Sequence, residues 1–414
     1  MADTRFPEGF MWGTAASSTQ TEGAGPRSTW AAFEAAGRVP PSGDGNGFAT
    51  RYREDFAQLA SLGLAHHRLS LDWSRLEPDA GKHDPAAVEH YREMLRAGRD
   101  AGLSMWVCLH HFTLPGWFAD DEGGFLDPGA RRYYWARHVD WVAETFGDLV
   151  DGWKPINEPV AYAFGGWLAG EIPPGERDLG RFGLALESVL LANHDAWRLL
   201  ASGDQPVATI HNLSPIEPAT RTGDERERGA AAESAKLFDE VIWSTWTRFL
   251  RDGVLAVPGR AEIEVPEAAE SFDLIGFSYY GALAVYADLT TGPYPTDQPA
   301  GPVGFAAWPE GLGITLRRLA HDLPGRPLLI AECGLGLPAA DDDDRQRVEY
   351  LDECLGVTED AIADGVDVRG FFAWTSVDNY EWSLGDTANF GIIGRDRTPK
   401  PSAELLGRWA TGAR

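Results

Sequence analysis

The sequence is poor in cysteine and in basic residues, and both shortages limit what the protein can be. Its three cysteines, Cys108, Cys333 and Cys354, lie far apart, which gives neither a disulfide framework nor the spacing of a zinc site. Lysine and arginine number 36 against 63 aspartates and glutamates, so the formal net charge is −27. Because nucleic acid is polyanionic, this charge argues against a nucleic-acid partner and favours a neutral or cationic ligand.

Long apolar runs are also missing. No stretch approaches the ~20 residues that cross a bilayer, so we expect no membrane contact. The opening residues, MADTRFPEGFMWG, lead into folded-looking sequence without the charged and then apolar segment of a secretion signal. Together with the scattered cysteines, this pattern predicts a reducing, cytoplasmic location. The oligomeric state stays open.

The chain does contain a regular alternation of two patterns. With 414 residues, 43% of them apolar, it can bury a large core. Short apolar runs typical of strands are followed by stretches with apolar residues at helical spacing, such as residues 51–63, 87–102 and 345–365. We count eight strand-like runs: residues 10–17, 66–73, 104–111, 152–159, 207–214, 272–280, 326–333 and 368–375.

This alternation predicts the fold. Strands that alternate with helices pair in parallel, and eight such units close into a barrel. No proline- or serine-rich linker divides the chain, so we predict an α/β fold in which residues 1–414 form a single (β/α)8 TIM barrel. The segments 18–50 and 281–308 are rich in Gly, Pro, Thr and Asp, and we expect them to be loops around the barrel mouth. Function in this architecture lies at the carboxyl ends of the strands.

Two of the predicted strands end in a glutamate. The stretch WKPINEPVA places Glu158 at the end of the fourth run, and LLIAECG places Glu332 at the end of the seventh. Strands three positions apart in a small barrel face each other across its mouth, so the two carboxyl groups should be opposed. Such a pair suits glycoside hydrolysis, in which one carboxyl protonates the leaving oxygen and the other acts from the opposite face of the sugar. A single strand-end glutamate is more often structural, but a pair among aromatic residues favours catalysis.

Adjacent histidines, His66–His67 and His110–His111, raise the alternative of a metal site. Neighbours on a strand point to opposite faces, and the two-histidine spacing of a helical zinc motif is missing. The GDGNG turn at 43–47 lacks the downstream acidic ligand of a calcium loop. The four aspartates at 341–344 precede a predicted helix, where negative charge is stabilising. We therefore expect no bound metal, and nothing in the sequence indicates a cofactor.

Six motifs extend over nearly the whole chain: FPEGFMWGTAASSTQTEG, RYREDFAQLASLGLAHHRLSLDWSRLEP, LHHFTLP, INEP, IAECG and VDNYEWSLG, the last followed by NFG. In their order and spacing these motifs resemble glycoside hydrolase family 1, the retaining β-glucosidases and β-galactosidases. The resemblance implies a barrel enzyme that forms a covalent glycosyl-enzyme and then hydrolyses it.

The resemblance also implies roles for individual residues. Glu158 would be the general acid and base, and Glu332 the nucleophile. Asn157 would bind the sugar 2-hydroxyl, while Arg68 and Tyr280 would hold the nucleophile. For this division Glu158 needs a raised pKa, and Arg68 beside Glu332 would keep the nucleophile ionised. The other residues implied to bind substrate are Gln20, His111, Phe112, Ser278, Trp374, Glu381, Trp382 and Phe390.

The chain departs from the family pattern at several positions around the site. Both glutamates stay in place, so the departures bear on sugar preference and rate rather than on the reaction class. Cys333 follows the nucleophile, and alternation along the strand turns it away, so we expect a packed thiol there. The residues that differ from the family's usual choice are Phe112, Thr113, Pro155, Ser278, Ala331, Cys333 and Asn389.

The leading hypothesis is a retaining β-glycosidase that releases terminal, non-reducing β-linked sugars. One alternative is a transglycosidase of the same chemistry. Another is a catalytically silent sugar-binding barrel, against which the presence of both glutamates argues. Glu381 would repel a sugar 6-phosphate, so a phosphosugar substrate is disfavoured. The expected partner is a small β-glycoside or oligosaccharide, with the sugar (gluco, galacto or fuco) and the aglycone left open.

Overall fold

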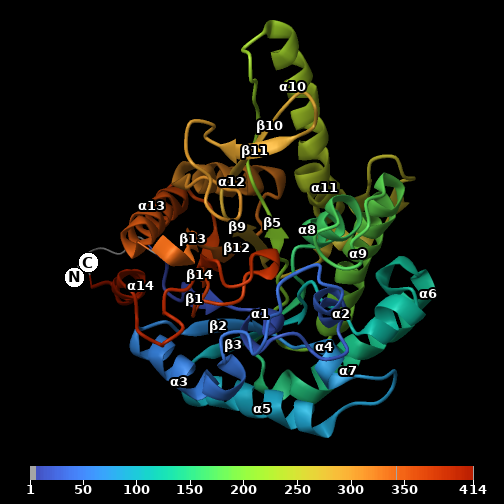
Figure 1. Cartoon of the computed structure of the whole chain (residues 1–414), viewed down its shortest axis with the longest axis vertical. Helices are drawn as coiled ribbons and strands as arrows, with labels where there is room; N and C mark the ends of the chain where they lie inside the picture. Colours follow the sequence, from blue (N-terminus) through green and yellow to red (C-terminus); the bar gives the residue numbers. More distant parts are fainter. Residues whose placement is uncertain (1–5, 342, 414) are drawn as a thin grey trace.

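The computed structural model describes residues 6–341 and 343–413, and its centre is a sheet of eight strands (Figure 1). The strands are ordered β4-β3-β2-β1-β14-β12-β9-β5, and every neighbouring pair is parallel. Each lies inside one of the eight runs predicted from the sequence. Their bounds are β1 (Met11–Ala15), β2 (His66–Ser70), β3 (Ser104–His110), β4 (Gly152–Ile156), β5 (His211–Asn212), β9 (Ile275–Tyr279), β12 (Leu328–Cys333) and β14 (Val368–Trp374).

The two edge strands of this sheet meet, which closes the barrel. The Ala208 amide donates to the carbonyl of Trp153 at 2.8 Å, and the Trp153 amide donates to Pro206 at 2.9 Å. Further along, the Glu158 amide donates to the carbonyl of Ile210 at 3.0 Å. The segment before β5 thus pairs with β4, and the predicted closed barrel is confirmed.

Helices surround the strands, as Figure 1 shows. Apolar residues of the outer strand faces pack against them in one large core, whereas Trp106, Leu329, Phe372 and Trp374 belong to a separate cluster. We interpret this second cluster as the packed barrel interior, because its members alternate along the strands with residues of the outer core. The longer surrounding helices are α3 (Phe48–Ser61), α5 (Pro85–Asp100), α7 (Ala136–Phe146), α9 (Leu179–Leu200), α11 (Thr245–Asp252), α12 (Pro309–Asp322), α13 (Asp344–Ala363) and α14 (Pro401–Thr411).

The two segments predicted to be mouth loops carry short elements of their own. Segment 18–50 contains α1 and α2, and the five residues of α1, all buried and all polar, give no amphipathic signal. Segment 281–308 forms a hairpin that pairs with β6, and this small sheet lies beside α10, which projects from the body in Figure 1. The bounds of the elements at the mouth are α1 (Ser18–Glu22), α2 (Thr29–Ala35), α4 (Trp73–Leu76), α6 (Pro128–Ala130), α8 (Pro159–Ala163), β6 (Ile216–Pro218), α10 (Glu225–Asp239), β10 (Ala282–Val285) and β11 (Thr291–Tyr294).

No helix among the described residues is both long enough and apolar enough to cross a bilayer. The three cysteines are buried free thiols. Cys333 packs in the outer core, as strand alternation predicts.

Candidate active site

Glu158 and Glu332 line one cavity of about 160 Å³ at the carboxyl ends of the barrel strands. Glu158 lies two residues after β4, at the N-cap of α8, in a left-handed conformation with φ 47°. The residue after it, Pro159, begins the helix and fixes the turn. Glu332 lies near the end of β12, where the register with β9 shifts between Ile330 and Glu332. Both irregular positions bring a carboxyl group from the barrel wall into the cavity.

Glu332 is held by two donors, the buried Arg68 and the half-buried Tyr280. The Arg68 guanidinium, on β2, forms an ion pair with one carboxylate oxygen of Glu332. The Tyr280 hydroxyl donates to the other oxygen at 2.5 Å. Burial and the neighbouring charge of Glu332 raise the pKa of Tyr280 well above its ordinary value, so this hydroxyl keeps its proton. Glu332 therefore has a counter-charge and a fixed orientation, which suit a nucleophile.

The environment of Glu158 favours the protonated form of its carboxyl group. Burial, and next the charge of Glu332, raise the pKa of Glu158 to about 8. Polar contacts from Ser278 and Asn212, together with the charge of Arg68, act in the lowering direction and offset this only in part. A carboxyl group with that pKa is largely protonated at neutral pH, which suits a proton donor.

Gln20 and Glu381 form one wall of the site. The Gln20 amide donates to Glu381 Oε2 at 2.9 Å and to the Tyr380 carbonyl at 3.0 Å, and the Ser17 hydroxyl donates to Gln20 Oε1 at 2.7 Å. Burial and then the charge of Glu332 raise the pKa of Glu381 to about 8. At neutral pH Glu381 is thus largely a neutral hydrogen-bonding group, and it repels phosphate fully only at higher pH.

His111 and Asn157 form a second polar pair. Arg68 Nη1 lies 3.1 Å from His111 Nδ1, and His111 Nε2 lies 3.4 Å from the Asn157 amide nitrogen. Burial and the charge of Arg68 keep the pKa of His111 well below its ordinary value, so the ring is neutral and carries its proton on Nε2. Asn157 Oδ1 is buried without a partner among the described residues. With the Asn157 amide turned so that its oxygen faces His111, the oxygen accepts a hydrogen bond from Nε2–H and the NH2 group is offered to a ligand.

Aromatic rings provide the apolar surface of the cavity. Trp374, at the end of β14, and Trp382 each lie nearly parallel to His111, with interplanar angles of 11°. Phe390 packs edge-on against Tyr280 at 5.8 Å. Flat apolar surfaces beside a few fixed polar groups match a sugar, which has C–H faces and hydroxyl edges.

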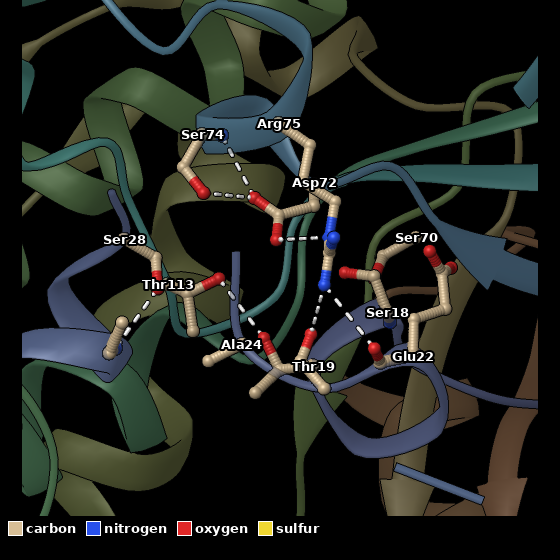
Figure 2. A network of polar contacts seen from close by, with 12 residues as sticks. Ser18, Thr19, Glu22, Ala24, Ser28, Ser70, Asp72, Ser74, Arg75 and Thr113 are labelled. Atoms are coloured by element: carbon tan, nitrogen blue, oxygen red, sulfur yellow. Dashed lines mark hydrogen bonds and ion pairs between the residues drawn. The ribbon is translucent and has the colours of Figure 1, made fainter. Parts of the chain in front are cut away.

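The helix that carries Gln20 is fixed by a buried polar network, which Figure 2 shows. The Ser18 amide, on α1, donates to the Ser70 hydroxyl at 2.8 Å. At the other end of α1, Arg75 donates to the Glu22 carbonyl at 3.3 Å and pairs with Asp72 at 3.4 Å. These contacts connect α1 to β2 and α4, and so position Gln20 against Glu381.

The structure places all of the predicted site residues in the cavity wall or directly behind it. Gln20 and Arg68 are fully buried behind the cavity surface and act on it through Glu381 and Glu332 respectively. Ser278 is also fully buried, and its hydroxyl acts in the direction that lowers the pKa of Glu158. The predicted residues that line the cavity are His111, Phe112, Asn157, Glu158, Tyr280, Glu332, Trp374, Glu381, Trp382 and Phe390.

Sequence reasoning missed three lining residues, Asn212, Val303 and Phe305. Asn212 ends β5, and an amide at the end of a predicted strand is the signal that would have identified it. Val303 and Phe305 lie in the long segment after β9, whose sequence carries no such signal. In the part of the chain that the structure describes, no cluster of histidine, cysteine or carboxylate side chains could hold a metal ion.

Comparisons with known proteins find relatives over nearly the whole chain. The family model described as glycosyl hydrolase family 1 matches residues 2–408. Thermostable beta-glucosidase B of Thermobispora bispora is 30% identical, over 92% of this chain and 85% of its own length. Beta-glucosidase A of Thermotoga maritima is 28% identical, over 98% of this chain and 96% of its own. The solved structure of a beta-glycosidase from Pyrococcus horikoshii superposes with a TM-score of 0.88 at 30% identity, covering 98% of this chain and 95% of that one.

Proposed function

This chain belongs to glycosyl hydrolase family 1, and we propose that it cleaves β-glucosides with Glu332 as nucleophile and Glu158 as acid and base. It is an O-glycosyl hydrolase of the retaining β-glycosidase type. The observation that supports the two roles is the contrast between the carboxyl groups. Glu332 is paired with a guanidinium, whereas burial and the charge of Glu332 raise the pKa of Glu158 to about 8.

In the first step a carboxylate oxygen of Glu332 attacks the anomeric carbon from the α face and forms a glycosyl ester. The bond from that carbon to the aglycone oxygen breaks, and the oxygen takes the proton of Glu158 as the alcohol leaves. As Glu332 becomes a neutral ester, the charge that raises the pKa of Glu158 disappears, which favours the ionised Glu158 left behind.

In the second step Glu158, now ionised, accepts a proton from a water molecule. The hydroxide attacks the anomeric carbon from the β face, and the ester bond to Glu332 breaks. Glu332 regains its negative charge next to Arg68, and the sugar leaves with the β configuration it had in the substrate. Two inversions at one carbon thus give net retention.

The polar wall suits a hexose, and we propose a gluco-configured sugar as the preferred substrate. Glu381, held by Gln20, and the pair of His111 and Asn157 offer two separate sets of hydrogen-bonding groups beside the ring surface of Trp374. The relatives named above as beta-glucosidases are consistent with this preference. We further propose that residues 1–414 act as one catalytic domain in carbohydrate metabolism, in a reducing cytoplasm that suits three free thiols.

A panel of aryl β-glycosides tests the substrate assignment. We expect the β-glucoside to be hydrolysed fastest, with release of phenol and free glucose in equal amounts. The cavity is lined by no lysine or arginine among the described residues, so the 6-phosphates should be turned over at least about tenfold more slowly. Phenol in excess of free sugar would indicate transfer to another acceptor, and faster turnover of the 6-phosphates would contradict the assignment.

The raised pKa of Glu158 predicts an alkaline limit to activity. The acid must be protonated to act, so kcat/KM should fall as the pH rises through about 8. The measurement is kcat/KM against pH for an alkyl β-glucoside, whose leaving group needs protonation, and for β-glucosyl fluoride, whose leaving group needs much less. The alkyl glucoside should lose activity at lower pH than the fluoride. Coincident profiles would show that Glu158 is not the group that protonates the leaving oxygen.

A further inference from the structure

One lysine lies inside the barrel, where the proposed mechanism does not use it. The chain has only four lysines, Lys82, Lys154, Lys236 and Lys400. Lys82 and Lys236 are exposed, whereas Lys154, on β4, is 0% exposed. Its Nζ lies 4.5 Å from the ring centre of Phe372 and 5.4 Å from that of Trp106, two residues of the barrel interior. A side chain that is normally well hydrated is therefore placed in an apolar interior.

The surroundings of this side chain favour the uncharged amine. Lys154 Nζ has no hydrogen-bond partner among the described residues, so an ammonium group there would lack acceptors for its three donors. Attraction to the ring faces offsets only part of the cost of burying such a charge. Burial, and next the charge of Arg68, hold the pKa of Lys154 well below its ordinary value, while the charge of Glu332 acts in the raising direction.

Lys154 belongs to a cluster of ionisable groups contributed by four barrel strands. Arg68 on β2 and Glu332 on β12 form the buried ion pair described above. Cys108 on β3 is the register partner of Lys154, and burial raises the pKa of Cys108 to about 11. Burial lowers the pKa of His66, at the start of β2, to about 4. The thiol and the imidazole are thus uncharged at neutral pH, so within this cluster Lys154 responds to the charges of Arg68 and Glu332.

The charge of Glu332 changes during the reaction, and this change couples Lys154 to catalysis. When Glu332 forms the glycosyl ester, it loses the negative charge that favours a proton on Lys154. Because such coupling is reciprocal, a proton on Lys154 shifts the equilibrium away from the ester. The transition states lie between the two charge states of Glu332, so this proton should slow formation of the ester and speed its hydrolysis.

We propose that Lys154 controls the nucleophile from inside the barrel: as a neutral amine it permits attack by Glu332, and as an ammonium group it slows that attack. Lys154 does not touch the substrate, so it is a positioning residue that acts through the charge of Glu332. This role presupposes that Glu332 is the nucleophile, as proposed above.

Lysine NMR can measure the coupling without any catalysis. In the full chain labelled with carbon-13 at lysine Cε, Lys154 is assigned by elimination with Lys82→Arg, Lys236→Arg and Lys400→Arg. The Lys154 signal should titrate below the ordinary range of a lysine, and at a still lower pH in Glu332→Gln, which lacks the negative charge. A titration in the ordinary range, no titration above the pH of acid unfolding, or the same titration in Glu332→Gln would overturn the proposal whether or not the chain hydrolyses β-glucosides.

The pH dependence of the two steps gives a second test, with Lys154→Met as the variant. For an alkyl β-glucoside, kcat/KM reports attack by Glu332, and the ratio of kcat/KM in the variant to that in the parent should rise at least about threefold as the pH falls from neutral. For a dinitrophenyl β-glucoside, kcat reports hydrolysis of the ester, and the same ratio should fall. A merely structural role would not move the two steps in opposite directions.

Leu329→Met is the matched control, because it places the same side chain elsewhere in the barrel interior. Its two pH profiles should follow those of the parent. Lys154→Met profiles that coincide with the parent's, or ratios that move in the same direction for both steps, would overturn the proposal. A parent enzyme inactive on every β-glucoside would instead refute the proposed function. The NMR titration does not use Lys154→Met, so it decides the matter even where this variant fails to fold.

Discussion

Glu332→Gly is expected to abolish hydrolysis of every β-glycoside, with kcat reduced by roughly 10⁴-fold or more. Without the carboxylate no glycosyl ester can form, and the leaving-group quality of the substrate cannot compensate. The measurement is steady-state kinetics with an aryl β-glucoside and with β-glucosyl fluoride. Activity within tenfold of the unsubstituted enzyme on either substrate would assign the nucleophile to another residue.

The same change leaves Arg68 buried without its partner, so loss of folding must be separated from loss of chemistry. Breaking a buried ion pair from one side typically costs ~3–5 kcal/mol of stability. Glu332→Gln is the matched control, because its amide oxygen can still accept from Arg68 or Tyr280 while the group is a poor nucleophile. We expect Glu332→Gln to unfold at a temperature closer to that of the parent and to be equally inactive. An inactive glycine variant beside an active glutamine variant would indicate a structural role alone.

Glu158→Ala is expected to separate the two steps of the reaction. Aryl glucosides with good leaving groups need little protonation, so they should still form the glycosyl-enzyme. Hydrolysis of the glycosyl-enzyme should stall, because no base remains to deprotonate water, and kcat should fall by roughly 10²–10⁴-fold. Azide is already an anion and needs no base, so adding it should restore turnover and give the β-glucosyl azide. The measurement is the rate of phenol release with and without azide, with the product configuration determined by NMR.

The matched comparison for this rescue is Glu332→Gly in the same azide buffer. There azide attacks the substrate directly from the α face, so any product should be the α-glucosyl azide. If Glu158→Ala gave the α-azide and Glu332→Gly the β-azide, the two roles would be reversed. A Glu158→Ala enzyme that azide does not stimulate would show that the residue has no part in the second step.

The sequence was sufficient to predict the barrel because its strands are short apolar runs at regular intervals. The first and last residues of individual strands and helices were less predictable where tertiary contacts decide them. The fifth run spans residues 207–214, but only His211–Asn212 forms a strand in the sheet, because the residues before it are shared between β4 and β9. Helix α1 was read as loop because all five of its residues are buried and polar contacts, not an apolar stripe, hold them.

Site residues at strand ends could be predicted because a barrel places them on one rim. Val303 and Phe305 could not, since they reach the cavity from a long segment whose path depends on the β10–β11 hairpin. The protonation state of Glu381 also could not be predicted from the sequence. A carboxylate was expected there, but burial and Glu332 raise the pKa of Glu381 to about 8. Such pKa values depend on burial and on which charged groups the fold brings close together, and the spacing of residues along the sequence does not show this.

The central claim is that the sugar becomes bonded to Glu332 during catalysis. A 2-deoxy-2-fluoro-β-glucosyl fluoride should react with the enzyme once per chain, because the fluorine at carbon 2 slows both steps while the good leaving group at carbon 1 keeps formation of the ester faster than its breakdown. Mass spectrometry of the intact protein gives the stoichiometry, and fragmentation of its peptides gives the labelled residue. The account predicts a single sugar on Glu332 in the peptide around LLIAECG, and no label in Glu332→Gln. A label on Glu158 or on any other residue, or rapid turnover without a trapped ester, would contradict it.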